Sequence, residues 1–154
     1  MSQTSETAGS LAGPMGAQVL EALSSAAISM GAKRGVRWRR EEHARSQLPD
    51  EYAVSMGFVG AHLRGELSVA LSESALSVLS PGRPPAMGTV ELAEGLARVV
   101  RDCLEVADEP VRLSVPLAMG GVAGLVVRDR DGHLYLADGD RRLECRLRIE
   151  RSED

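Results

Sequence analysis

The segment 52–79 constrains the fold more than any other part of the sequence. Residues 52–60 and 63–71 each alternate apolar side chains with small or polar ones, which is typical of strands with one buried face. The connection between them, Gly60-Ala61-His62, is tight. The sequence therefore predicts an antiparallel hairpin.

Three further segments are predicted to be helical. Ser72 is a suitable N-cap for a short helix over 73–79, which the cluster Pro81-Gly82-Arg83-Pro84-Pro85 would end. Residues 16–30 have amphipathic spacing, with Gly31 as the C-terminal stop. Residues 88–106 leave only a narrow polar stripe, so we expect this helix to be largely buried. Its two apolar rows are Val90, Ala93, Ala97, Val100 and Leu104, and Leu92, Leu96, Val99, Cys103 and Val106.

The Arg-rich stretch 35–45 has a different pattern. Val36 and Trp38 alternate with Arg37 and Arg39, which predicts a short, half-exposed strand. Trp38 is then either a packed edge residue or an anchor for an interface. The pattern favours neither.

The C-terminal third is predicted to be mostly sheet. Its strand-like runs, separated by turns such as Asp131-Gly132 and Asp138-Gly139-Asp140, are 111–117, 121–127, 133–137 and 143–149. Because no regular strand-helix-strand repeat occurs, the sequence predicts an α+β fold, a mainly antiparallel sheet with two long helices packed on it. We expect one domain over 15–150, with tails at 1–14 and 151–154.

Composition restricts the partners and the compartment. A net charge of −4 with both signs interspersed argues against nucleic acid as a partner. No apolar run is long enough for a membrane span, and the start does not resemble a signal peptide. Cys103 and Cys145 have no metal or disulfide spacing, so we expect two reduced, buried thiols in a cytoplasmic protein.

No motif indicates a cofactor or a metal. His43, His62 and His133 lack metal-ligand spacing. The acids between Asp129 and Asp140 resemble fragments of a calcium loop, but its twelfth position is Asp140 rather than Glu and strands flank it. We expect hairpin turns there. No nucleotide-binding loop and no activated-serine elbow occurs.

One stretch resembles a known family. Residues 54–76, VSMGFVGAHLRGELSVALSESAL, resemble the hairpin and helix start of the CheX chemotaxis phosphatases, which share the CheC/CheX/FliY fold. Flanking features in the same order extend the resemblance over roughly 15–150, including Glu91-Leu-Ala-Glu94 in a buried helix and Leu113-Ser-Val-Pro116. The resemblance implies a sheet flanked by two long helices, and removal of phosphate from the aspartyl phosphate of a receiver domain.

The motif of that family is E-x-x-N. The resemblance implies that the acid anchors the protein to the receiver domain and that the Asn amide positions the attacking water. An amide can donate and accept hydrogen bonds at once without adding charge. Here Glu91 takes the place of the acid, but Glu94 stands where the Asn belongs. A carboxylate cannot donate, and it brings negative charge towards a phosphoryl group. Shifting the frame by one turn places Ala97 there, and Glu21 with Ser24 is a second candidate pair on the first helix.

The polar stripe of the helix over 88–106 has two interpretations. Glu94 and Arg98, and Arg101 and Glu105, have the i,i+4 spacing of ion pairs, so the stripe is either a self-paired solvated face or a partner-binding face formed by Glu91, Glu94, Arg98 and Arg101. We predict a non-catalytic adaptor for bacterial chemotaxis or motility. It would bind a receiver domain or another signalling protein and form a homodimer through a sheet edge. The alternative is an active aspartyl-phosphate phosphatase.

Overall fold

The computed structural model describes residues 14–42, 51–119 and 132–151. The strands in these ranges are β1 (Arg39–Glu41), β2 (Glu51–Gly60), β3 (Leu63–Ser72), β4 (Val111–Leu113), β5 (Leu117–Met119), β6 (Gly132–Asp138) and β7 (Arg141–Arg151). The helices are α2 (Pro14–Ala32), α3 (Glu73–Leu79) and α4 (Pro85–Val106).

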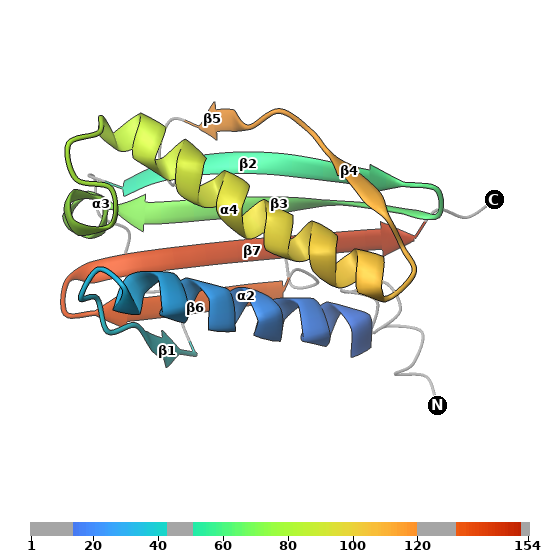
Figure 1. Cartoon of the computed structure of the whole chain (residues 1–154), viewed down its shortest axis with the longest axis horizontal. Helices are drawn as coiled ribbons and strands as arrows, with labels where there is room; N and C mark the ends of the chain where they lie inside the picture. Colours follow the sequence, from blue (N-terminus) through green and yellow to red (C-terminus); the bar gives the residue numbers. More distant parts are fainter. Residues whose placement is uncertain (1–13, 43–50, 120–131, 152–154) are drawn as a thin grey trace.

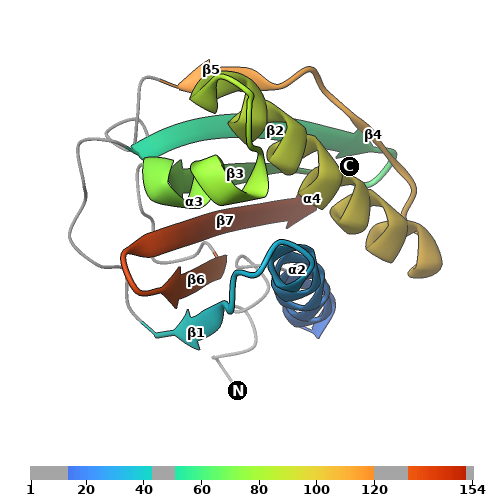
Figure 2. The same cartoon turned by 60° about the vertical axis from the view of Figure 1, so that its left-hand side comes forward.

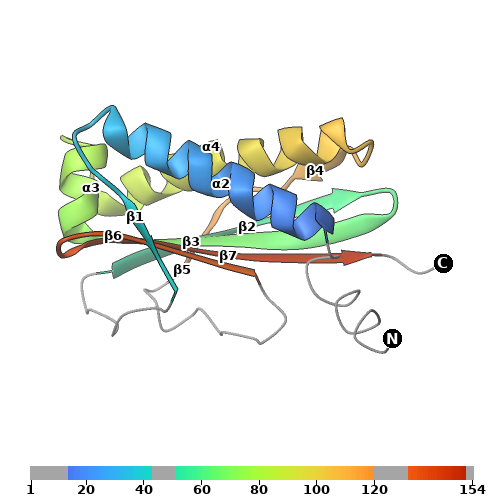
Figure 3. The same ribbon diagram turned by 90° about the horizontal axis from the view of Figure 1, so that it is seen from below.

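The strands form one antiparallel sheet in the order β1-β6-β7-β3-β2-β4, and β5 also pairs with β2. Helices α2 and α4 lie side by side on one face of this sheet (Figures 1 and 3). The predicted α+β architecture with two long helices on an antiparallel sheet is therefore confirmed. None of the helices in the described ranges is long and apolar enough to cross a membrane.

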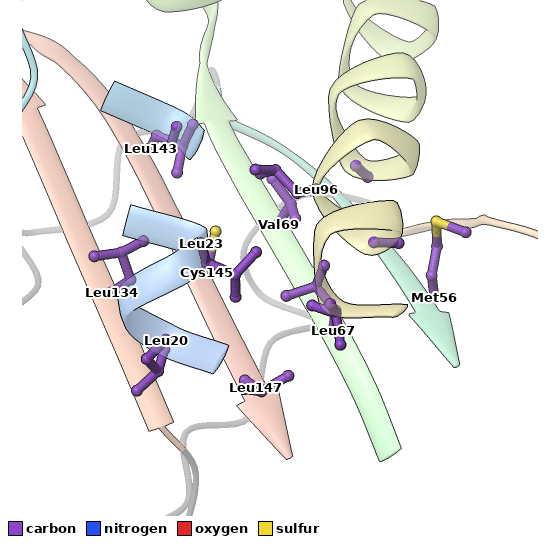
Figure 4. Packing of buried hydrophobic residues seen from close by; sticks show 14 of the residues in the cluster. Leu20, Leu23, Met56, Leu67, Val69, Leu96, Leu134, Leu143, Cys145 and Leu147 are labelled. Carbon is purple, nitrogen blue, oxygen red and sulfur yellow. The ribbon is translucent and has the colours of Figure 1, made fainter. Parts of the chain in front are cut away.

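The predicted hairpin is confirmed, and its register decides which side chains form the core. Val54 pairs with Val69 and Met56 with Leu67, so these four side chains point to the helix-covered face. Figure 4 shows Leu67 and Val69 beside side chains of α2, α4 and β7. The labelled residues from those elements are Leu20, Leu23, Leu96, Leu143, Cys145 and Leu147.

The opposite face of the sheet is polar. Ser55 and Ser68 are buried there and lie opposite each other in register. The Ser55 hydroxyl donates a 2.7 Å hydrogen bond to Glu66 Oε2. The alternation expected from sequence thus separates an apolar, helix-facing side from a hydrogen-bonded polar side.

The end of α2 differs from the prediction. Gly31 does not stop the helix, which continues to Ala32, and the left-handed turn falls at Gly35, with φ +82°. Gly31 instead makes room for the indole, because a Cβ there would lie 2.5 Å from Trp38 Cδ1. Trp38 is only 6% exposed, so it is a packed residue and not an exposed anchor.

Only part of the Arg-rich stretch is a strand. Val36 and Trp38 are buried before the strand begins, and β1 covers only Arg39–Glu41, paired with β6. Residues 43–45 of the Arg-rich stretch lie outside the described ranges. The prediction of buried apolar side chains alternating with exposed arginines is correct for 36–39.

The helix starts follow the sequence signals closely. The Ser72 hydroxyl caps α3 by accepting a 3.3 Å hydrogen bond from the Ala75 N–H. After α3 the chain turns at Gly82, with φ +81°. Helix α4 begins at Pro85, three residues before its predicted start, because proline is well tolerated in the first turn of a helix.

The apolar rows of α4 are largely buried, with one exception. Val106 is 90% exposed, so the prediction that it belongs to the buried row was wrong. It is the last residue of the helix, whereas Leu104, two residues earlier, is fully buried. The apolar periodicity therefore continues past the last buried position of the helix.

The predicted strand over 111–117 is split by a bulge. Phe58 pairs with Leu113, and Ser55 pairs with Leu117. The segment Ser114–Pro116 therefore has one residue more than the part of β2 that it faces, which is the definition of a β-bulge. Pro116 has no N–H to give to the ladder. Ser114 N donates to Gly57 O at 2.9 Å, and its hydroxyl accepts from Gly57 N at 2.8 Å.

The last predicted strands are confirmed where the structure describes them. Strands β6 and β7 form a hairpin that turns at Asp138-Gly139-Asp140, with Gly139 at φ +67°. The predicted strand over 121–127 lies outside the described ranges. Gly132, predicted to be a turn residue, is the first residue of β6.

The two cysteines have different environments. Cys145 is buried in the core, where desolvation and the nearby Glu144 raise its pKa to about 12, and burial also raises the pKa of the partly buried Cys103. The thiolate is the reactive form. We expect a maleimide at pH 8 to modify native protein only at Cys103 and to reach Cys145 only in urea, as mass spectrometry of the adducts would show. A Cys145 adduct in the native Cys103→Ser variant would contradict this.

Candidate functional site

Helix α4 carries the charged stripe singled out by the sequence. Glu91, in the first half of the helix, forms an ion pair with Arg83 of the preceding loop, at 3.0 Å between Glu91 Oε2 and Arg83 Nη1. The two side chains are 45% and 50% exposed, respectively. The sequence did not predict this pair, because it forms only when the turn at Gly82 folds the loop back against α4.

Of the two interpretations of the stripe, the self-paired face would need ion pairs between residues four positions apart. In the described part of the chain, no ion pair joins Glu94 to Arg98 or Arg101 to Glu105. Arg101 Nε lies instead 3.3 Å from Asp102 Oδ1, while Glu94 is partly buried and Arg98 is exposed. Exposed pairs of this kind contribute so little free energy that spacing alone does not decide which form.

The second motif position has no amide in either frame. Glu94 occupies it in the first frame. Ala97 occupies the same position in the shifted frame. It is 1% exposed and faces the core, so a partner could not reach its side chain. The carboxylate of Glu94 is therefore the polar group that α4 offers at the second motif position.

The second candidate pair lies on α2. Glu21 Oε2 accepts a 2.7 Å hydrogen bond from Arg40 Nη1 of β1. Ser24 is 6% exposed, so its hydroxyl is turned away from solvent.

The structure does not bring the two candidate pairs into one site. Helix α2 packs over β6, and α4 packs over β2, β3 and β4 (Figure 2). Glu21 is bound to the β1 edge, whereas Glu91 is bound to the loop before α4. The two acids therefore have separate ion-pair partners.

The histidines and turn acids that the structure describes show no metal arrangement. His133 stacks on Tyr135 with ring centroids 5.7 Å apart, and His62 is exposed in the hairpin turn. Asp138 Oδ2 accepts a 3.0 Å hydrogen bond from the Arg37 backbone N–H, so its carboxylate binds the segment before β1. Within the described ranges, no three His, Cys, Asp or Glu side chains are placed to hold a metal ion. His43 and the segment Asp129–Asp131 lie outside those ranges.

A charged row on β7 was not singled out by the sequence. Glu144 is partly buried, and desolvation raises its pKa against the opposing effect of Arg142, 3.3 Å away. The paired Tyr135 also has a raised pKa, from burial and then from Glu144, with Arg146 acting the other way. Strand alternation would have predicted that these groups share one face, but not that they are withdrawn from water.

A shallow groove of about 370 Å³ lies at the hairpin end of the molecule. It is lined by Val59, Gly60, Ala61, Pro110, Val111 and Arg112. None of the candidate motif residues lines it, and its one charged side chain is a cation.

No protein-family model matches the sequence, and no curated protein matches it either. Solved structures do match. The chemotaxis protein CheX from Vibrio vulnificus superposes with a TM-score of 0.65 at 13% sequence identity, covering 86% of this chain and 96% of that chain. A CheC-like superfamily protein from Shewanella sp. PV-4 gives a TM-score of 0.63 at 13% identity, with 86% and 94% covered.

A third match is the CheX–CheY–BeF3–Mg2+ complex from Borrelia burgdorferi, with a TM-score of 0.62 at 13% identity and with 86% and 95% covered. These identities are too low to transfer an activity, because one fold hosts many functions. They do confirm the resemblance at the level of architecture. The chain has the CheX-like fold of the CheC/CheX/FliY group.

Proposed function

We propose that this chain is a non-catalytic, CheX-like binding protein of bacterial chemotaxis or motility signalling, which engages a receiver domain through the outer face of α4. The observation that carries the proposal is Glu94, a carboxylate at the motif position where the family has an amide. The likeness to the Borrelia CheX that was solved in complex with CheY supports a receiver domain as the partner.

The physical argument against catalysis concerns the attacking water. In the family motif, the amide can hold the attacking water by both donating and accepting hydrogen bonds, whereas a carboxylate at Glu94 only accepts. Its charge would also oppose the approach of a phosphoryl group that carries nearly two negative charges. Binding has no such requirement, because a carboxylate on an exposed helix can recognise a cation directly.

Two further features belong to the proposal. We place the protein in the cytoplasm, where receiver domains work. Homodimerisation through a sheet edge suits the β4–β5 side better than the β1 side, because Val115 and Leu117 are exposed and apolar there. On the other edge, Arg39 is exposed and Arg40 already pairs with Glu21, so β1 offers a charged edge rather than an apolar one.

Charge reversal on α4 tests the binding face. We expect the double variant Glu91→Lys, Glu94→Lys to bind an unphosphorylated receiver domain roughly 10-fold more weakly than the unchanged protein, because two lysines replace an acidic face with one that repels a cation of the partner. Calorimetric titration against a panel of receiver domains measures this. Glu73→Lys, an exposed reversal on α3, is the control and should bind normally. Equal affinity of the double variant would identify the stripe as a solvated face.

The same proteins decide between binding and catalysis. Added to a phosphorylated receiver domain, the unchanged protein should leave the rate of phosphate loss as it is. A clearly faster loss of phosphate would favour the active phosphatase. If the faster rate disappears in Glu21→Gln, α2 carries the activity, and if it disappears in Glu91→Gln, α4 does.

A further inference from the structure

We infer that Glu94, rather than Glu91, is the carboxylate that α4 offers to a cationic group of its partner, and that Arg83 holds Glu91 as an intramolecular counter-ion. The inference rests on the proposed function and specifies which residue of the α4 face does the recognising.

The position of Arg83 is set by its loop. The Arg83 N–H donates to Ser80 O at 3.4 Å, and Gly82 adopts the left-handed conformation that turns the chain. Pro84 and Pro85 follow, and each fixes its own φ. A short loop restrained in this way loses little entropy when its arginine pairs with Glu91, which favours the 3.0 Å contact over the ion pairs that stay unformed along the stripe.

Glu94 is in the opposite situation. Within the described part of the chain its carboxylate has neither an ion pair nor a hydrogen bond. Arg98, which has the right spacing, does not reach it, and Arg101 turns to Asp102. Because Glu94 is also partly buried, its charge is screened less by water than that of a fully exposed acid.

A partner therefore meets two acids in different states. A cation that approaches Glu91 must displace Arg83, whereas one that approaches Glu94 replaces only water. Arg98 is exposed next to Glu94 on the helix and would repel a lone cation. The partner group that fits is a lysine or arginine with a carboxylate beside it, so that the carboxylate meets Arg98.

Neutral variants test which of the two acids contributes more to binding. Against an unphosphorylated receiver domain, Glu94→Gln should weaken binding about 5-fold and Glu91→Gln less than 2-fold, the range expected for exposed ion pairs. In an Arg83→Gln background, Glu91 is released, and Glu91→Gln should then cost about as much as Glu94→Gln. A larger effect of Glu91→Gln in the unchanged protein would overturn the inference while leaving the proposed function standing.

A partner-free measurement tests the role of Arg83 separately. Carboxyl groups are labelled with a water-soluble carbodiimide and an amine, and the rate at each residue is followed by mass spectrometry. Arg83→Gln should raise the labelling rate of Glu91 at least about 2-fold, the loss of a modest ion pair, and leave Glu94 unchanged.

The matched control is Arg64→Gln, which breaks another exposed pair, to Glu150 at 3.5 Å, and should affect only Glu150. If Arg83→Gln does not change Glu91 labelling, the inference is wrong whether or not a receiver binds. If labelling changes as expected but no receiver binds, the proposed function fails and the pairing of Arg83 with Glu91 stands.

Discussion

Replacing Gly65 with alanine is expected to destabilise the protein by about 3 kcal/mol or more, because the sheet has no room for a side chain there. A Cβ on Gly65 would overlap the Arg148 carbonyl oxygen of β7 and the ring of Phe58 on β2. Phe58 is the cross-strand neighbour of Gly65 and is itself fully buried. Neither the backbone nor the ring can move without disturbing the centre of the sheet.

Urea unfolding followed by circular dichroism measures this effect as a lower transition midpoint. The matched control is Gly95→Ala in the middle of α4, where the nearest atom, Met30 Cε, would lie 3.7 Å from the new Cβ. An alanine there should stabilise the helix by about 0.5–1 kcal/mol. If Gly65→Ala unfolds at the same urea concentration as the unchanged protein, the β2–β3–β7 packing described above is wrong.

Trp38→Ala is expected to destabilise the protein by about 3–5 kcal/mol, the usual cost of removing a large buried aromatic side chain. The indole fits against Gly31 at the end of α2 and joins that helix to the segment leading into β1. Its loss would leave a cavity that the backbone turn at Gly35 cannot fill.

Trp38 is the only tryptophan, so its fluorescence reports on this contact directly. The native emission should be blue-shifted and should move to the red in the same urea transition that circular dichroism follows. Trp38→Phe, which keeps an aromatic ring, should lose less stability than Trp38→Ala. A red, solvent-exposed emission from the native protein would indicate that the indole is free to act as an interface anchor.

The parts of the fold that were predicted correctly depend on local signals. The β2–β3 hairpin follows from two alternating runs and a tight connection, and α3 follows from the Ser72 cap and the Pro/Gly cluster behind it. In each case, the residues that decide the structure lie within a few positions of one another.

The parts that were missed depend on residues far apart in the sequence. Gly31 was predicted as a helix stop, yet its role is to accommodate Trp38. The bulge at Ser114 depends on Gly57, 57 residues away, and the exposure of Val106 depends on which elements pack against the end of α4. No local pattern contains this information.

The candidate site shows the same division. The sequence placed Glu91, Glu94, Arg98 and Arg101 on one helix face, because helical spacing is a local property. It did not predict the ion pair between Arg83 and Glu91, because the choice among several exposed ion pairs depends on the turn at Gly82.

The hydroxyl of Ser72 couples local structure to the rest of the chain. Besides the Ala75 N–H, its oxygen accepts the Arg142 N–H at 3.0 Å from a residue 70 positions away, so both lone pairs are used. Its hydrogen is left for Ser74 Oγ at 3.2 Å, and Ser74 in turn donates to Asp140 O. One hydroxyl thus serves the start of α3 and the start of β7 at once, so a change at Ser72 would remove hydrogen bonds from both elements together.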